Sequence, residues 1–441
     1  MINMHPSHVV FIQRICQAAS GVITAMLVAV YLTPIEQGFY YTMGSLLSAY
    51  SLLDLGLSGL LVQVSARLFA GLGFAADGEV RPVTERTEFV AMMNWARRWY
   101  AVAALIALAL LPAGWIYFNL ANRQSDVSWQ LPWIAIVPAV ALSMPAYPLL
   151  SILEGAGKVS EIYLVRILHY AVAALLSWIM LISGHGLYAL AMMPLSVAVI
   201  TLLWSRARFN KLMTLCRVHN GPAGFQWKTR LWPLHRQVAL VSVGNYIFLQ
   251  CPVPALFYLN GPKDAGRLGL SMLILNIISA ISMSWFTASI PRMTRLVSEG
   301  KRKASRQLFT REYGRFMVVM SALYVSMLAI VHGLPEISFV SRVLPFPELS
   351  VLMLTYLLTQ SMSAIGGYFR AYGREVFALA NISASILALA IASALVASFG
   401  ALGFLCGLAA AYWIILAPVL LWAWFKWLRP AEAGTPQLQA K

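Results

Sequence analysis

The stretch Gly38 to Val64, GFYYTMGSLLSAYSLLDLGLSGLLVQV, decides the fold. Its 27 residues hold one ionisable carboxylate, Asp54, and no basic residue. A helix of roughly 20 residues crosses the ~30 Å hydrocarbon core of a bilayer, so this stretch is long enough to span one. Its apolar residues are continuous rather than alternating, which favours a helix over a barrel strand. The stretch therefore predicts a membrane-spanning helix with an acid near its middle.

The whole chain has the composition of a polytopic membrane protein. Of its 441 residues, 60% are hydrophobic and only 11% are charged, whereas about a quarter of the residues of a soluble domain carry charge. The four cysteines lack metal-ligand spacing, and we expect no cofactor, no metal and no enzymatic activity. The first apolar run has no basic segment before it and is long enough to span, so we expect a retained helix rather than a cleaved signal.

Apolar runs along the rest of the chain predict an all-α protein with twelve transmembrane helices. We expect spans near 8–32, 38–64, 99–119, 131–153, 160–182, 186–204, 237–259, 266–290, 313–333, 349–369, 376–398 and 401–425.

The basic residues predict the orientation of these spans. With the N-terminus inside, the cytoplasmic segments hold 26 of the 32 lysines and arginines, and the outer loops hold four, namely Arg123, Lys263, Arg267 and Arg342. This asymmetry is a strong positive-inside signal. It predicts cytoplasmic N- and C-termini and explains the net charge of +16 without nucleic-acid binding, leaving anionic lipid as the expected partner of the basic surface.

The two halves of the chain match at nearly constant offsets. YLTPIEQG (31–38) corresponds to YLNGPKDAG (258–266), with Gly38 against Gly266, and Arg67 falls against Arg295 at the same offset. GAGK (155–158) falls against AYGR (371–374). The alternative is that glycines and basic residues recur at such places in any multi-helix membrane protein. A duplication predicts a six-helix bundle over 1–205, a cytoplasmic linker over 206–236, a second bundle over 237–428 and a short cytoplasmic tail over 429–441, with the substrate site between the bundles.

The chain resembles the polysaccharide-exporter (Wzx-like) branch of the MOP exporter superfamily, the flippases of lipid-linked oligosaccharides. The resemblance is carried by LTPIEQGFYYTMGSLLSAYSLLDLGLSGLLVQVSAR (32–67), by LEGAGK (153–158) and by the six-plus-six layout. It implies two bundles arranged as a V around a central cavity, alternating access, and a bacterial inner-membrane location. It also implies an undecaprenyl diphosphate-linked glycan as substrate, moved to the periplasmic leaflet for cell-surface polysaccharide, including lipopolysaccharide, synthesis. Other polysaccharide assembly proteins would be partners.

Asp54 is the most conspicuous candidate for a functional residue. At about 1.5 Å per residue it lies roughly 15 Å or more from either end of its span, too deep for its short side chain to reach water. Because insertion of an acid there costs about 2.5–3.5 kcal/mol, it should face a cavity or a partner. A salt bridge to a cavity cation, a protonatable site and a structural hydrogen bond to a nearby serine or to the backbone all remain open.

Other polar residues within the spans are cavity candidates. Arg14 and Gln17 start a polar and small stripe that continues through Gly21 and Thr24. Arg14 either faces the cavity, where it could hold a diphosphate, or snorkels to the inner interface, and the same choice holds for Arg166, which has His169 three residues on. The uncharged candidates either line the cavity or link helices: Asn245, Gln250, Asn276 and Gln360.

Two interpretations remain for the basic run EGKRKASRQLFTREYGR (299–315). The run is a solvated loop that sets topology, or a surface that gathers anionic lipid or the carrier diphosphate.

For the function, the alternative to flipping is a MATE-like antiporter of drugs or metabolites coupled to H⁺ or Na⁺, with Asp54 as coupling acid. A glycosyltransferase or polymerase would need acidic residues on a large outer loop, which the sequence lacks.

Overall fold

The computed structural model describes residues 6–74, 80–81, 87–121, 126–218, 225–370, 372 and 376–425. Eleven helical stretches within these ranges are long and apolar enough to cross a membrane. Many large apolar side chains lie exposed along them, including Phe11, Leu105 and Val318, as expected where lipid rather than water surrounds the protein. The chain is a multi-pass membrane protein, and the all-α prediction is confirmed.

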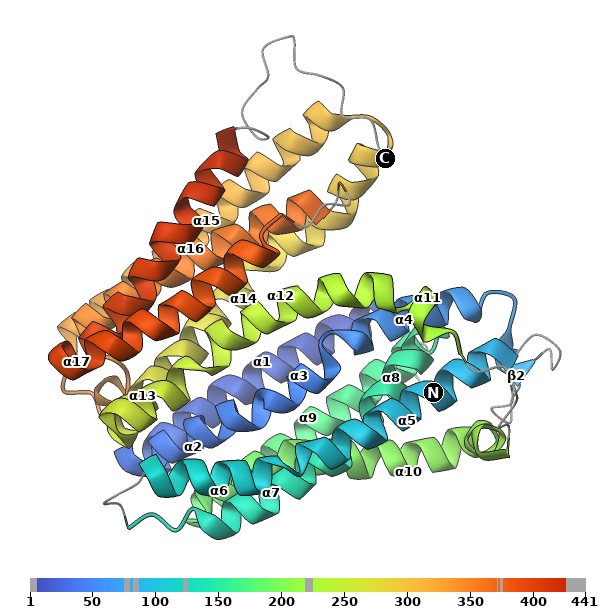
Figure 1. The fold of residues 1–441 in the computed structure, drawn as a ribbon, viewed down its shortest axis with the longest axis horizontal. Helices are drawn as coiled ribbons and strands as arrows, with labels where there is room; N and C mark the ends of the chain where they lie inside the picture. The colour runs from blue at the N-terminus through green and yellow to red at the C-terminus, as the bar shows by residue number, and fades with distance from the viewer. Residues whose placement is uncertain are drawn as a thin grey trace. The chain divides into compact units, whose positions relative to one another are not determined.

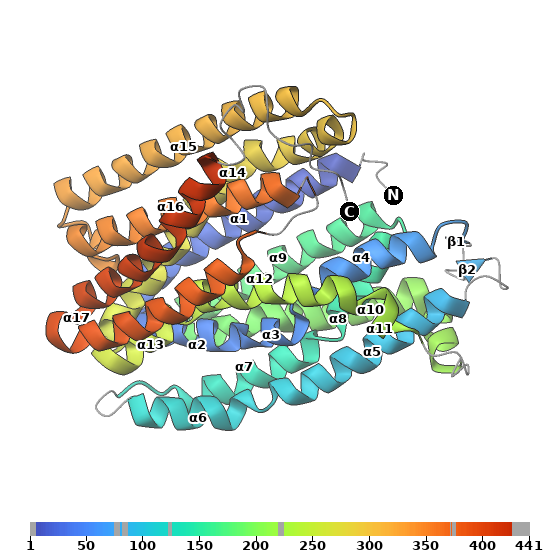
Figure 2. The same cartoon turned by 45° about the horizontal axis from the view of Figure 1, so that its top comes forward.

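Five predicted spans form single or nearly single helices. They are α1 (Pro6–Tyr31), α9 (Val159–Ile182), α14 (Pro262–Ser298), α15 (Arg302–Gly333) and α16 (Phe346–Arg370). The sixth predicted span begins with the short helix η2 (Gly186–Tyr188) and continues as α10 (Ala189–Val218). In both Figure 1 and Figure 2, α1 runs beside α9, against which it packs.

Four other spans are interrupted near their middles. The second span comprises α2 (Pro34–Leu47), η1 (Ser48–Tyr50), α3 (Ser51–Asp54) and α4 (Leu57–Leu68). The third comprises α5 (Thr87–Ala107) and α6 (Leu110–Ala121), and the fourth α7 (Gln130–Ser143) and α8 (Ala146–Gly155). The seventh comprises α12 (Trp232–Gln250), preceded by the short α11 (Trp227–Arg230), and α13 (Pro252–Asn260).

Prolines account for three of these interruptions, because proline lacks the N–H that continues a helical ladder. Pro112 lies in the first turn of α6, Pro145 directly precedes α8, and Pro252 begins α13. The second span is broken at Leu55 and Gly56, where the backbone turns left-handed.

The last two spans share one continuous element, α17 (Ala378–Ala423). Its 46 residues would extend about 69 Å as a straight helix, more than twice the hydrocarbon thickness. The backbone reverses at Gly400, whose φ of 59° suits glycine. Beyond the turn, Gly407 lies against the backbone of Ala392. The element is therefore a hairpin of two antiparallel helices, as the predicted spans 376–398 and 401–425 require.

Two expectations about the connecting segments need correction. A two-stranded antiparallel pair, β1 (Gly73–Phe74) with β2 (Val80–Arg81), follows α4 in the predicted inner loop. The basic run at 299–315 is not a loop, because α15 begins at Arg302; most of the run consists of good helix formers with no glycine or proline between 302 and 313. Outside the helices, hydrogen bonds from Lys301 and Arg295 hold the pKa of the Glu299 carboxyl below its usual range.

The helices α2 and α14 meet at the two glycines that the sequence repeat pairs. A Cβ added to Gly38 would lie 2.0 Å from the carbonyl oxygen of Pro262, and one added to Gly266 would lie 2.8 Å from the Gly38 nitrogen. The buried side chain of Gln37 reinforces the crossing by donating a 2.9 Å hydrogen bond to the Gly266 carbonyl. Only glycine allows the two backbones to approach this closely.

The internal contacts divide the chain into two compact units. One comprises Met1–Ile274 with Glu336–Leu344, and the other Leu275–Pro335 with Pro345–Lys441. The predicted division into halves at 206–236 follows the sequence repeat rather than these contacts and stays a prediction. The predicted tail at 429–441, and most of the AYGR segment of the repeat, lie outside the described residues.

Candidate functional site

Asp54 lies at a break in the second span and caps the helix that follows. The backbone of Leu55 and Gly56 turns left-handed, with φ of 43° and 77°, between α3 and α4. The Asp54 carboxylate accepts hydrogen bonds from the backbone nitrogens of Gly56 and Ser58, at 3.1 and 3.2 Å. The acid therefore satisfies backbone donors that the break leaves without helical partners.

Two side-chain hydroxyls complete the surroundings of this carboxylate. Ser58 Oγ donates to Oδ2 at 3.0 Å, and Tyr100 of α5 donates its hydroxyl to Oδ1. Each carboxylate oxygen thus receives one backbone and one hydroxyl donor, and a carboxylate has about four lone-pair sites in all. A proton or metal ion binding at Asp54 would have to displace one of these donors.

Arg166 of α9 is held by an acid at the C-terminal end of α8. Its Nη2 lies 2.7 Å from Oε2 of Glu154, with side chains 27% and 17% exposed. The guanidinium also lies over the ring of Tyr163, 4.7 Å from the centroid, a favourable cation–π geometry. Arg166 is therefore fixed by α8 and by its own helix. His169 takes no part in this, because it is buried and its Nε2 lies 3.2 Å from Oγ1 of Thr201 on α10.

The ion pair between Glu154 and Arg166 should contribute measurably to stability. We expect Glu154→Gln to cost about 1.5–3 kcal/mol, the net value of a hydrogen bond to a charged group, and to lower the melting temperature in detergent. A double-mutant cycle with Arg166→Gln checks the cause, since the double variant should be little worse than either single variant. Strictly additive losses would contradict the pairing.

A group of tyrosines connects Asp54 to the two arginines. Tyr50 stacks on Tyr147 of α8, with ring centroids 6.0 Å apart and hydroxyl oxygens 3.5 Å apart. Tyr50 also interacts electrostatically with Asp54 and with Tyr170 of α9. Tyr170 in turn is influenced by the charge of Arg166 and, more weakly, by that of Arg14. Together with Tyr100 of α5, these side chains of α1, η1, α3, α8 and α9 form one polar group, called the tyrosine cluster below.

Arg14 is the second cation of this tyrosine cluster. Its side chain is exposed, and within the described ranges it has neither an ion-pair nor a hydrogen-bond partner. Gln17 is also exposed and accepts a 3.3 Å hydrogen bond from the buried amide of Gln13. Thr24, further along the same stripe, accepts one from Trp178 of α9 at 2.9 Å, so the stripe contacts a neighbouring helix at its far end.

The comparisons with known proteins concern the fold. No family model matches the chain, and no curated protein matches its sequence. Among solved structures, the lipid II flippase MurJ in an inward closed conformation matches over 95% of this chain and 86% of its own, with 12% identity and a TM-score of 0.64. An outward-facing MATE family multidrug resistance transporter of the MOP superfamily matches over 94% and 93%, with 14% identity and a TM-score of 0.55. The MATE multidrug transporter DinF-BH, solved in a complex, matches over 95% and 94%, with 14% identity and a TM-score of 0.54.

The chain has the MOP-transporter fold. The likeness covers 94–95% of this chain, far more than the segment at 32–67 that first suggested it. The resemblance to the MOP superfamily is confirmed at the level of fold.

Within the MOP fold, the remaining candidates lie on helices that contribute no side chain to the tyrosine cluster described above. Asn245 is exposed and Gln250 half-buried on α12, in the first compact unit. Asn276 on α14 and Gln360 on α16 are half-buried in the second unit. Their predicted roles in lining a cavity or linking helices stay predictions.

Sequence reasoning missed the aromatic and acidic members of this cluster in the MOP fold. Signals for some of them were present. Tyr163, Arg166 and Tyr170 recur at intervals of three and four, which places them on one helical face, and Tyr50 precedes Asp54 by four residues. Nothing in the sequence singled out Glu154, Tyr100 or Tyr147, because their partners lie on other helices.

Proposed function

We propose that this protein moves a lipid-linked oligosaccharide from the cytoplasmic to the outer leaflet of a bacterial inner membrane by alternating access. The observation that carries the proposal is the tyrosine cluster, in which Tyr170 is influenced by the charges of the anchored Arg166 and of Arg14, a cation with no partner among the described residues. A cation supplies the charge that a carrier diphosphate needs. Tyrosine rings and hydroxyls suit the faces and hydroxyls of sugars.

The charge of such a substrate agrees with outward movement. In a cell that is negative inside, each negative charge carried outward gains about 2.3 kcal/mol per 100 mV. The membrane potential therefore assists export of a diphosphate. The solved MurJ structure, a flippase of lipid II by its name, supports the idea that the same fold accommodates a lipid-linked substrate.

Arg14→Gln should reduce export without displacing the protein from the membrane. Loss of one charge-assisted contact of about 1.5 kcal/mol corresponds to a roughly tenfold fall in export. The measurement is the leaflet distribution of carrier-linked oligosaccharide in a gene-deletion strain complemented with each variant. Arg292→Gln, which removes an exposed arginine far along α14, is the matched control and should export normally. Wild-type export by Arg14→Gln would contradict the assigned role.

The second candidate function is the MATE-like antiporter, since two of the matched solved structures are multidrug transporters. The four donors around Asp54 weigh against that acid as the coupling site. Loss of the gene would decide between the two functions. Carrier-linked oligosaccharide accumulating on the cytoplasmic leaflet supports flipping, whereas unchanged glycans with hypersensitivity to cationic dyes support the antiporter.

A further inference from the structure

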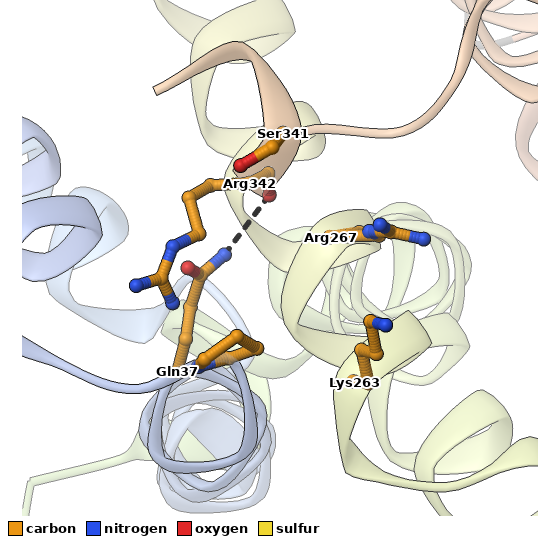
Figure 3. Close-up of a pocket in the computed structure, with 6 residues that line it drawn as sticks. Gln37, Lys263, Arg267, Ser341 and Arg342 are labelled. Carbon is orange, nitrogen blue, oxygen red and sulfur yellow. Dashed lines mark hydrogen bonds between the residues drawn. The ribbon is translucent and has the colours of Figure 1, made fainter. Parts of the chain in front are cut away.

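Three of the four lysines and arginines that the topology leaves outside gather at one pocket. Lys263, Arg267 and Arg342 line a cavity of about 240 Å³ together with Pro34, Gln37 and Ser341. Figure 3 shows Lys263 and Arg267 on the first turns of α14 to one side of the Gln37 amide, with the Arg342 guanidinium on the other. Residues from α2, α14 and the short helix η3 (Val340–Arg342) thus meet at one end of the first compact unit.

The walls of this outer pocket are fixed by Gln37. This side chain is 1% exposed and donates hydrogen bonds to the Gly266 carbonyl at 2.9 Å and to the Arg342 carbonyl at 3.1 Å. It therefore ties α2, α14 and η3 together beside the glycine crossing. A site with walls held in this way needs little reorganisation to bind a ligand.

The cations of the outer pocket have too few acids to neutralise them. Among the described residues, the one ion pair of Arg267 is a loose one, 3.8 Å from Asp264, and that carboxylate also accepts a 2.6 Å hydrogen bond from Asn260. Lys263 has no partner among the described residues. The Nη1 atom of Arg342 is buried and finds no hydrogen-bond acceptor in the described part of the chain, whereas most buried polar atoms have a partner.

The placement of these cations is unfavourable unless an anion accompanies them. Lys263 and Arg267 lie in the first turns of α14, where the helix dipole favours negative charge and repels positive charge. Basic residues are also rare in outer loops. Local helix electrostatics and membrane topology both disfavour this cluster, yet it surrounds a cavity several times the ~30 Å³ that one water occupies in the liquid.

We propose that the outer pocket binds a phosphate-type anion, the class that includes both a carrier diphosphate and the headgroup of an anionic lipid. Lys263 and Arg267 contact the phosphate oxygens, and Ser341, whose hydroxyl donates to the Ser338 carbonyl at 2.8 Å, lines the pocket beside them. The carrier diphosphate as occupant rests on the proposed function, since the pocket would hold the charged group after it reaches the outer side. The binding of a phosphate-type anion does not depend on transport.

The test is calorimetric titration of the full-length protein in detergent with inorganic diphosphate. We expect saturable binding that weakens at least tenfold in the double variant Lys263→Gln with Arg267→Gln, while Arg292→Gln binds as the wild type does. Lys263 is exposed and Arg267 half-buried, and an unchanged melting temperature of the double variant confirms that it folds. Absence of saturable binding, or equal binding by the double variant, overturns the proposal.

The source of the phosphate is distinguished by repeating the titration in nanodiscs. If nanodiscs of phosphatidylglycerol weaken diphosphate binding relative to nanodiscs of phosphatidylcholine, the natural occupant is a lipid headgroup. If undecaprenyl diphosphate added to phosphatidylcholine nanodiscs weakens diphosphate binding, the occupant is the carrier. Failure of both lipids to compete overturns the assignment to a lipid phosphate. Because no transport is measured, diphosphate binding stands even where the Arg14→Gln export experiment fails.

Discussion

Gly38→Ala is expected to destabilise the protein by about 3 kcal/mol or more, at or above the upper end of the range for overpacked interiors. The added Cβ would lie 2.0 Å from the carbonyl oxygen and 2.5 Å from the carbonyl carbon of Pro262. Both are backbone atoms of the first turn of α14, so no side-chain rotation relieves the clash. The measurements are the yield of monodisperse protein on size-exclusion chromatography and the melting temperature in detergent.

Gly59→Ala is the matched control for this prediction. Gly59 lies inside α4, and a Cβ there would meet no atom within 4 Å. Because alanine favours a helix by up to about 1 kcal/mol over glycine, this variant should be as stable as the wild type or more so. A wild-type melting temperature for Gly38→Ala would show that the two helices do not cross at these glycines.

Asp54→Asn is expected to destabilise the protein by about 1–3 kcal/mol and to impair export while the protein stays in the membrane. Each carboxylate oxygen accepts one backbone N–H, from Ser58 at Oδ1 and from Gly56 at Oδ2. Whichever oxygen the amide nitrogen replaces, one half-buried backbone donor loses its acceptor, and leaving such a donor unsatisfied costs up to about this much. Rotation of the Ser58 or Tyr100 hydroxyl cannot compensate, because it does not restore the acceptor that the backbone N–H has lost.

Ser58→Ala separates the contribution of the backbone from that of the hydroxyl. It removes one donor to the Asp54 carboxylate and leaves both backbone hydrogen bonds intact, so the variant should lose about 1 kcal/mol of stability. Melting temperatures of both variants are compared in the same detergent, and export is measured in the complemented deletion strain. Full export by a well-expressed Asp54→Asn variant would show that the charge of this residue is not needed for transport.

Much of the fold followed from local sequence signals. Continuous apolar runs predicted the spans, including the two separated by Gly400, because burial in lipid depends on each segment's own composition. The breaks at 54–57 and 107–110 and the β1–β2 pair were not predicted. A change of backbone direction inside an apolar run leaves its hydropathy almost unaltered, and each strand of the pair comprises only two residues.

The candidate site was less predictable because its residues are brought together by the tertiary fold. Asp54 and Arg166 were recognisable as charges deep in apolar runs, but their partners were not, since Tyr100 and Glu154 lie on other helices. The structural hydrogen bonds foreseen as one reading of Asp54 are present. Whether that acid also acts in transport depends on the export experiment, not on position alone.

The crossing of α2 and α14 brings two residues that the sequence repeat pairs, Gly38 and Gly266, into direct contact. Equivalent positions of the two repeats touch each other there, as a residue on a two-fold axis touches its own copy in a symmetric dimer. A half-length ancestor that assembled as a homodimer would make this contact with a single glycine, and one substitution in its gene would enter the interface twice. In that case duplication and fusion would have split the site into two independent codons, Gly38 and Gly266. Each half could then change separately. The first half has isoleucine and phenylalanine after Pro34 and Gly38, whereas the second has lysine and arginine after Pro262 and Gly266, and under a duplication this difference would be such a change.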